Sequence, residues 1–246
     1  MISEHARREM AYLANDLAPN ARAEERDLLI KALLLAPDQD VLEVGAWDGY
    51  LASRLAGHEI STTLVDRMSF GVERLRKQFP TMRVFEGLQE RIPVLGDSFD
   101  RVASLVALHH VNAVAFIKEA RRVLRAEGRV AIVEVGRGSR VAMFLDTYVD
   151  KMTQPRGHRG IYLSPGEWVA HLEAAGFEAS AEYRTAHWRF RTMSQAIEYC
   201  RLVFGMSPTV TDADIQAAIE LLDPVAGDDA AISWEWPLLV VTGDVD

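Results

Sequence analysis

The sequence has a single cysteine, Cys200, among its 246 residues. One cysteine cannot form a disulfide within the chain, and this is typical of proteins of the reducing cytoplasm. Long apolar runs are missing as well. The stretch Leu28–Ala36 is interrupted by Lys31 and is far shorter than the roughly 20 residues that a membrane-spanning helix needs. We therefore expect a cytoplasmic protein without a membrane-spanning helix.

Basic residues are in the minority, with 27 Lys and Arg against 36 Asp and Glu, for a net charge of −9. This balance repels nucleic-acid phosphates and excludes a nucleic-acid partner. We interpret the basic run Arg121, Arg122, Arg125 and Arg129 as a solvated helix end, where cations interact favourably with the helix dipole. The seven histidines and the cysteine show no metal-ligand spacing, so we expect no metal site.

Two signatures of nicotinamide-dependent reductases are also absent. The chain has no Gly-x-Gly-x-x-Gly and no Tyr-x-x-x-Lys pair to protonate a carbonyl. With 49% hydrophobic and 26% charged residues, the chain has the length and composition of one α/β domain with insertions, or at most of two small domains.

The most informative segment that is present is Val41–Tyr50. An apolar strand carries an acid, Glu43, passes through Gly45 and Gly49, and leads directly into a helical pattern. A strand that turns into a helix within a few residues needs the backbone freedom of glycine. This segment predicts a nucleoside-binding turn.

A second β-rich run, Ser61–Asp66, also ends on an acid. Asp66 lies 17 residues after Gly49. In nucleoside-binding α/β folds, an acid near this offset accepts hydrogen bonds from the ribose hydroxyls. Asp66 is therefore a candidate ribose ligand, although it can instead cap the helix that begins near Met68.

Together, Glu43, Gly45, Gly49 and Asp66 resemble the first two binding motifs of the class I S-adenosylmethionine-dependent methyltransferases. The segment 97–111 is similar to the fourth strand of that family and its following loop, and the segment 120–134 resembles the next helix-turn-strand unit. The resemblance covers roughly residues 38 to 135 in the expected order.

This resemblance implies a Rossmann-like, seven-stranded, mostly parallel α/β sheet with helices on both faces. It implies S-adenosylmethionine as cofactor and methyl transfer to a small organic acceptor, a metabolite or natural product. The cofactor-binding residues that it implies are Glu43, Gly45, Ala46, Trp47, Gly49, Asp66, Arg67, Leu88, Gln89 and Leu105.

The chain departs from the family pattern at two places. Trp47 stands where a glycine is commoner, and Gly87-Leu88 replaces a Gly-Asp pair whose acid contacts adenine. Backbone groups, Gln89 or packing must then hold the adenine. The departures leave open an alternative: a protein of this fold that binds S-adenosylmethionine without transferring methyl, such as an isomerase, a cyclase or a partner subunit.

His109 and His110 follow the fourth predicted strand and are the candidate general bases, because an imidazole accepts a proton near neutral pH. One of them can instead simply fix the loop. His158, in a glycine-flanked basic loop, is a further candidate, or a surface residue without function.

We predict strands near 40–45, 61–66, 81–86, 100–105, 129–135, 177–183 and 236–242, and helices near 49–57, 68–78, 111–124 and 164–175. Ser164 and Glu167 predict a capping box at the last helix. In a single domain of residues 1–246, we expect an N-terminal helical segment, 1–36, and lid insertions at 137–163 and 185–232 over the substrate site. A homodimer is left open.

Overall fold

The computed structural model describes residues 3–49, 51–227 and 231–246. The chain divides into two compact units. The core unit comprises Arg26–Arg137, Ile161–Arg184 and Leu238–Asp246, and the insertion unit comprises Met1–Glu25, Gly138–Gly160 and Thr185–Pro237. The insertion unit is thus built largely from the three segments that fall outside the predicted core pattern.

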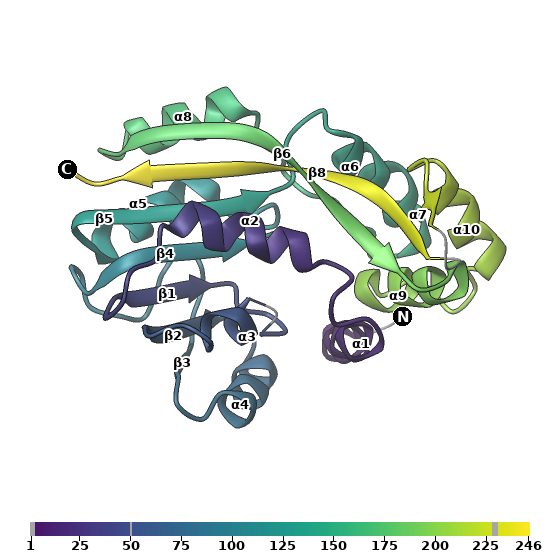
Figure 1. Cartoon of the computed structure of the whole chain (residues 1–246), viewed down its shortest axis with the longest axis horizontal. Helices are drawn as coiled ribbons and strands as arrows, with labels where there is room; N and C mark the ends of the chain where they lie inside the picture. The colour runs from purple at the N-terminus through teal and green to yellow at the C-terminus, as the bar shows by residue number, and fades with distance from the viewer. Residues whose placement is uncertain (1–2, 50, 228–230) are drawn as a thin grey trace. The chain divides into compact units, whose positions relative to one another are not determined.

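A mostly parallel sheet forms the core unit (Figure 1). Its strand order is β3-β2-β1-β4-β5-β8-β6, and the strands β1 to β5 pair in parallel while β8 is antiparallel to β5. The bounds are β1 (Asp40–Val44), β2 (Ser61–Asp66), β3 (Arg83–Glu86), β4 (Phe99–Leu105), β5 (Leu124–Glu134), β6 (Glu178–Phe190) and β8 (Ile232–Asp244). The predicted Rossmann-like α/β sheet is confirmed.

Three details of the strands differ from the sequence prediction. β6 and β8 are each 13 residues long, so both extend well past their predicted bounds, and their residues Thr185–Phe190 and Ile232–Pro237 belong to the insertion unit. A short strand, β7 (Val225–Ala226), pairs with β8 in addition to the seven predicted strands. β5 begins at Leu124, so Arg125 and Arg129 lie on a strand rather than at a helix end.

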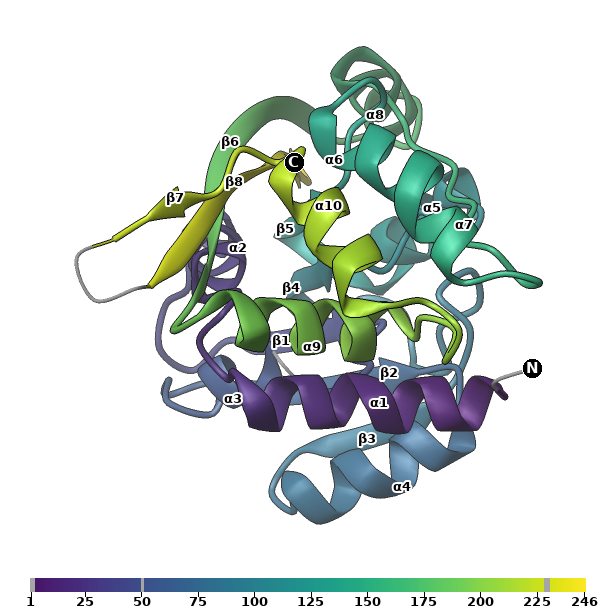
Figure 2. The ribbon, with the colours of Figure 1, turned by 90° about the vertical axis from the view of Figure 1, so that its right-hand side faces the viewer.

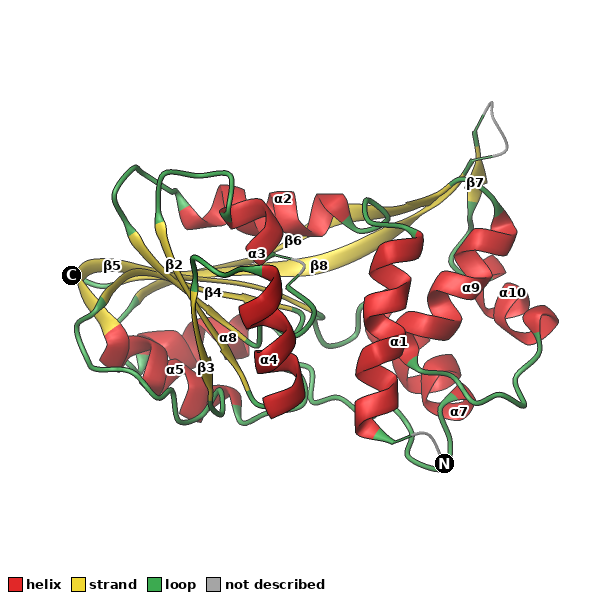
Figure 3. Cartoon of the chain, turned by 90° about the horizontal axis from the view of Figure 1, so that it is seen from below, coloured by secondary structure: helices red, strands yellow, loops and turns green. Residues whose placement is uncertain are grey.

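Helices cover both faces of the core sheet (Figure 3). Apolar side chains of α3 (Ala52–Leu55) and α4 (Ser69–Gln78) pack with Leu64 and Val84 on one face. On the other face, α5 (Ala113–Val123) and α8 (Pro165–Glu173) contribute to the larger cluster around Leu42, Val102 and Ile132. The predicted capping box of α8 is present.

The insertion unit is mainly helical. α1 (Glu4–Leu17) lies beside α9 (Met193–Phe204), as Figure 2 shows. Its other helices are α6 (Arg140–Phe144), the π-helix η1 (Leu145–Val149), α7 (Asp150–Met152) and α10 (Asp212–Glu220), and α2 (Ala23–Leu33) has residues in both units. Trp188 packs at a ring separation of 4.2 Å on Trp236. None of the described helices is long and apolar enough to cross a membrane.

Candidate functional site

The turn after β1 depends on glycine at two positions. Gly45 has φ +78°, and a Cβ atom there would lie 2.6 Å from the Cβ atom of Ala107. Gly49 has φ +74°, and a Cβ atom there would lie 2.6 Å from the ring of Phe79. Any larger residue would meet both an unfavourable backbone conformation and a steric clash. The predicted strand-glycine-helix geometry therefore exists, and both glycines pack tightly.

Hydrogen bonds hold this turn against the end of β2. The backbone N–H groups of Gly45 and Ala46 donate to the carbonyl of Val65, at 2.9 and 3.2 Å. The carboxylate of Asp66 accepts from the N–H of Trp47 at 2.8 Å and from the N–H of Met68 at 2.9 Å. Asp66 therefore fixes two loops at once, the turn after β1 and the residue before α4. The sequence suggested a contact near Met68 as the alternative to ribose binding.

Trp47 shows how the chain accommodates its departure from the family pattern. Its φ is +42°, in the left-handed region that favours glycine. The side chain is half-buried, and the N–H is fixed by Asp66. A non-glycine residue is thus held here in the backbone conformation that a glycine would adopt easily. Its neighbour Tyr50 lies outside the described residues.

Three carboxyl groups are buried around the turn: Glu43, Asp48 and Asp66 are 3%, 6% and 2% exposed. Oε2 of Glu43 has no hydrogen-bond partner among the residues that the structure describes. Burial, and next the nearby charges of Asp48 and Asp66, raise the pKa of Glu43 well above its usual value. Such a site is electrostatically suited to a cationic ligand and unsuited to a pyrophosphate.

The loop after β3 brings Gln89 to the turn. Gln89 is 6% exposed, its Oε1 has no partner within the described part of the chain, and its Nε2 lies 3.5 Å from where a Cβ of Gly45 would be. Leu88, by contrast, is 51% exposed. Arg67 is exposed, and Leu105 is half-buried at the end of β4. The structure thus groups Gln89 with the turn and shows no such contact for Arg67 or Leu88.

The two predicted histidines differ sharply in environment. His109 is buried, and its Nδ1 lies 2.9 Å from Oε1 of Glu134. His110 is exposed, with its ring centroid 4.2 Å from that of His109. The carbonyl of His109 also accepts from the N–H of Ile161 at 2.7 Å. His109 is therefore fixed by both its backbone and its side chain.

Glu134, at the end of β5, was not among the predicted site residues. Its carboxylate accepts from the N–H groups of Leu108 and Val135, each at 2.7 Å, as well as facing His109. Burial opposes ionisation, but the charge and hydrogen bond of His109 and the two N–H groups outweigh it and lower the pKa of Glu134. An acid at the end of a buried strand, the signal that identified Glu43, would have identified it.

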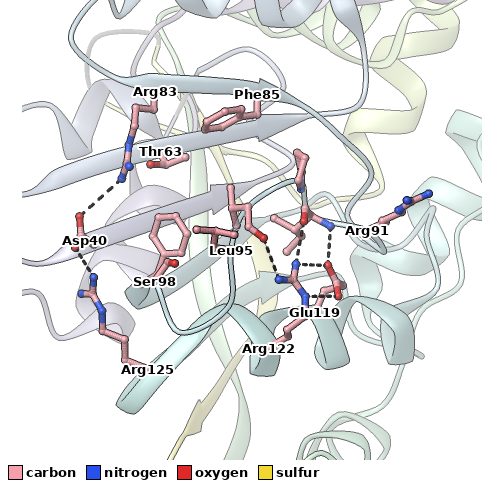
Figure 4. Close-up of a pocket in the computed structure, with 14 residues that line it drawn as sticks. Asp40, Thr63, Arg83, Phe85, Arg91, Leu95, Ser98, Glu119, Arg122 and Arg125 are labelled. Carbon is pink, nitrogen blue, oxygen red and sulfur yellow. Dashed lines mark hydrogen bonds and ion pairs between the residues drawn. The ribbon is translucent and has the colours of Figure 1, made fainter.

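A pocket of about 820 Å³ lies elsewhere in the core unit (Figure 4). Its lining includes Asp40 at the start of β1 and Arg83 at the start of β3, so it lies at the amino ends of the strands, and it contains none of the predicted site residues. Arg122 pairs with Glu119 at 2.7 Å, and Arg125 pairs with Asp40 at 2.8 Å. These charges are satisfied by one another.

Comparison with known proteins shows which proteins this chain resembles. Residues 42–132 match the methyltransferase domain model. The uncharacterized methyltransferase Rv3342 of Mycobacterium tuberculosis is 29% identical over 150 residues, which cover 57% of this chain and 62% of the relative. The matched segment, residues 42–132, is therefore similar to a methyltransferase domain. The chain therefore aligns with only about three-fifths of that relative's length.

Solved structures share the fold of this chain. The YcgJ protein of Bacillus subtilis superposes with a TM-score of 0.66 at 19% identity, covering 91% of this chain and 98% of YcgJ. The (4+2)-cyclase SpnF superposes with a TM-score of 0.60 at 19% identity, covering 90% of this chain and 80% of SpnF. At these identities, the likeness concerns the fold alone.

Proposed function

We propose that the protein binds S-adenosylmethionine at the turn after β1 and transfers its methyl group to a small organic acceptor. The observation that carries this proposal is a set of three buried carboxyl groups around a glycine turn, in which Oε2 of Glu43 has no partner among the described residues. S-adenosylmethionine carries a sulfonium and an ammonium and has no phosphate. Its charges complement a site that would repel a dinucleotide.

The residues present fit this cofactor. Glu43 offers a buried acceptor for the ammonium group, and Gln89 offers one for the exocyclic amine of adenine in place of the absent acid at Leu88. Asp66 is the candidate ribose ligand, in addition to its role in the turn. Gly45, Ala46, Trp47 and Gly49 are proposed to form the backbone wall, with Arg67 and Leu105 at its margin.

Few other groups are needed for the reaction. When bound, the cofactor supplies a methyl group on a sulfonium, which is already an activated electrophile. The chain's own residues must align the acceptor and remove its proton. We assign the proton transfer to His109, which is buried and fixed, and retain the exposed His110 as the second candidate.

We further propose that the segments 137–163 and 185–232 select the acceptor as a lid. β5 ends at Glu134, so the first of these segments leaves the sheet at the carboxyl ends of the parallel strands. This is the edge at which ligands bind in open α/β folds. A small-molecule acceptor, cytoplasmic location and a natural-product pathway are parts of the same proposal.

Isothermal titration tests the cofactor site. We expect wild-type protein to bind S-adenosylmethionine and S-adenosylhomocysteine, and not NADH. Glu43→Gln should weaken S-adenosylmethionine binding about tenfold, whereas the exposed Glu178→Gln, at the start of β6, should leave it unchanged. Absence of binding to both adenosyl compounds would refute the proposal.

The alternative of a non-methylating protein is favoured by Trp47 and Leu88 and by the cyclase of the same fold. Incubation with S-adenosylmethionine labelled in its methyl group, together with a panel of phenols, amines and carboxylic acids, separates the two. Transfer of label supports the methyltransferase. Tight binding of the cofactor with no transfer to any acceptor class supports the alternative.

A further inference from the structure

We propose that Glu134 is a positioning residue that keeps the neutral ring of His109 protonated at Nδ1, so that Nε2 is the atom that accepts the acceptor's proton. This inference rests on the proposed function, because it assigns a base for methyl transfer. It also narrows the substrate class to acceptors whose O–H or N–H group loses a proton during the transfer.

The position of the Glu134 carboxylate does not depend on the imidazole. The N–H groups of Leu108 and Val135 donate to its two oxygens, each at 2.7 Å, and the residue is 2% exposed. These donors belong to two different elements, the loop after β4 and the end of β5. These two backbone donors fix the carboxylate of Glu134 without any contribution from His109, so the imidazole ring orients to the carboxylate.

The chemistry of the pair determines the tautomer. An ionised carboxylate can only accept hydrogen bonds, and the two N–H groups of Leu108 and Val135 favour the ionised form of Glu134. With Nδ1 of His109 at 2.9 Å from Oε1, the proton of a neutral ring lies on Nδ1. The basic lone pair is then on Nε2, on the opposite side of the ring.

The resulting step balances. As an oxygen or nitrogen of the acceptor forms its bond to the methyl carbon, the carbon–sulfur bond breaks and its electron pair stays on sulfur. The acceptor's proton moves to Nε2 of His109. The imidazolium that forms is stabilised by the negative charge of Glu134 at 2.9 Å. The exposed His58, which belongs to no proposed site, provides a matched control for this role.

The tautomer can be measured without cofactor or acceptor. We would label the full chain with ¹⁵N-histidine and record long-range ¹H–¹⁵N correlations at pH 7.5, assigning His109 and His110 with the variants His109→Gln and His110→Gln. We expect the Nδ1–H tautomer for His109 in the wild type. An Nε2–H tautomer, or a ring protonated at both nitrogens, overturns the proposal even if no variant of Glu134 folds.

Two further measurements separate a positioning role from a structural one. Glu134→Gln should shift the ¹⁵N signals of His109 away from the pure Nδ1–H pattern. With a phenol that the wild type methylates, it should lower kcat about tenfold or more while the affinity for S-adenosylmethionine changes less than about twofold. Unchanged ¹⁵N signals, or equal losses of kcat and cofactor affinity, would contradict the inference.

The failure of this inference is distinguishable from failure of the proposed function. If the wild type does not bind S-adenosylmethionine, the methyltransferase proposal fails whatever the tautomer is. If the cofactor binds and label is transferred but His109→Gln is as active as the wild type, the methyltransferase proposal stands and the role of the Glu134–His109 pair is refuted. As the control, the exposed His58→Gln should retain activity within about threefold.

Discussion

Trp47 and Asp66 are joined by a hydrogen bond of 2.8 Å from the backbone N–H of the tryptophan to the carboxylate, across the junction of β1 and β2. The second carboxylate oxygen accepts from the N–H of Met68 at 2.9 Å. One side chain therefore satisfies two partly buried backbone donors, which would each be costly to leave without an acceptor. Because each carboxylate oxygen of Asp66 accepts one of these hydrogen bonds, replacing either oxygen would leave one backbone N–H without its acceptor.

Asp66→Asn tests that contact. An amide has one acceptor oxygen, so one of the two N–H groups loses its partner, and we expect the free energy of unfolding to fall by about 1 to 3 kcal/mol. Urea denaturation measures this change. Glu173→Gln, an exposed residue at the end of α8, is the control and should stay within about 0.5 kcal/mol of the wild type. Equal stability of Asp66→Asn and wild type would contradict the geometry.

Gly45→Ala tests the glycine turn. The added Cβ would lie 2.6 Å from the Cβ of Ala107, and the φ of +78° is unfavourable for alanine, so we expect a loss of about 2 to 4 kcal/mol. Gly166→Ala in α8 is the matched control, since a Cβ there meets nothing within 4 Å. That variant should be neutral or slightly more stable. Thermal unfolding of both variants gives the comparison.

Glu43→Gln tests the electrostatics of the cofactor site. Because burial raises the folded-state pKa of Glu43, its contribution to stability is fully present below the unfolded pKa, near 4.5, and is lost as pH rises through the folded value. The glutamine variant has no charge to bury. Without cofactor, we expect it to be more stable than wild type near pH 8, with the difference shrinking towards pH 4.5. A difference that is independent of pH would refute this account.

Glu167→Gln tests the capping box of α8. Hydrogen bonds from the backbone and side chain of Ser164 lower the pKa of Glu167 to about 2. The pH dependence is opposite to that of Glu43. The contribution of Glu167 to the free energy of unfolding is present above pH 4.5 and is lost as the pH falls towards 2. Glu167→Gln should therefore flatten the pH dependence of stability in that acidic window. Wild type and variant with parallel curves there would contradict the prediction.

Structural features that depend on residues close together in the sequence were predictable. The glycine turn after β1 and the capping box of Ser164 and Glu167 each depend on residues within a few positions, and each appears as expected. The parallel sheet was predictable for the same reason, because alternating strand and helix patterns permit few topologies. The family resemblance added the cofactor and the order of its candidate ligands.

Contacts between distant residues were not predictable. The pair of His109 and Glu134 is separated by 25 residues, and nothing in the local pattern of either residue names the other. The family resemblance named Gln89 as a cofactor residue, but no local pattern predicted that its Nε2 lies 3.5 Å from where a Cβ of Gly45 would be. The extension of β6 to Phe190 is set by its partner β8, which is equally long and far away in the sequence.

The insertion unit depends on a buried charge that also connects distant segments. Glu25 is fully buried, and its carboxylate accepts from Nε of Arg22 at 2.8 Å and from Nε1 of Trp188 at 2.5 Å. Glu25→Gln would leave the 6% exposed guanidinium of Arg22 facing a neutral amide. Breaking a buried ion pair in this way should reduce stability by about 3 to 5 kcal/mol.

The neighbouring residue supplies the control for this last prediction. Glu24 makes an ion pair with Arg189 at 2.6 Å, but its side chain is 35% exposed and that of Arg189 is 59% exposed. Solvent screens such a pair, so Glu24→Gln should cost at most about 1 kcal/mol. Urea denaturation followed by tryptophan fluorescence measures both variants, since Trp188 contacts Glu25 directly. Comparable losses for the two substitutions would show that burial does not set the strength of the Glu25 contact.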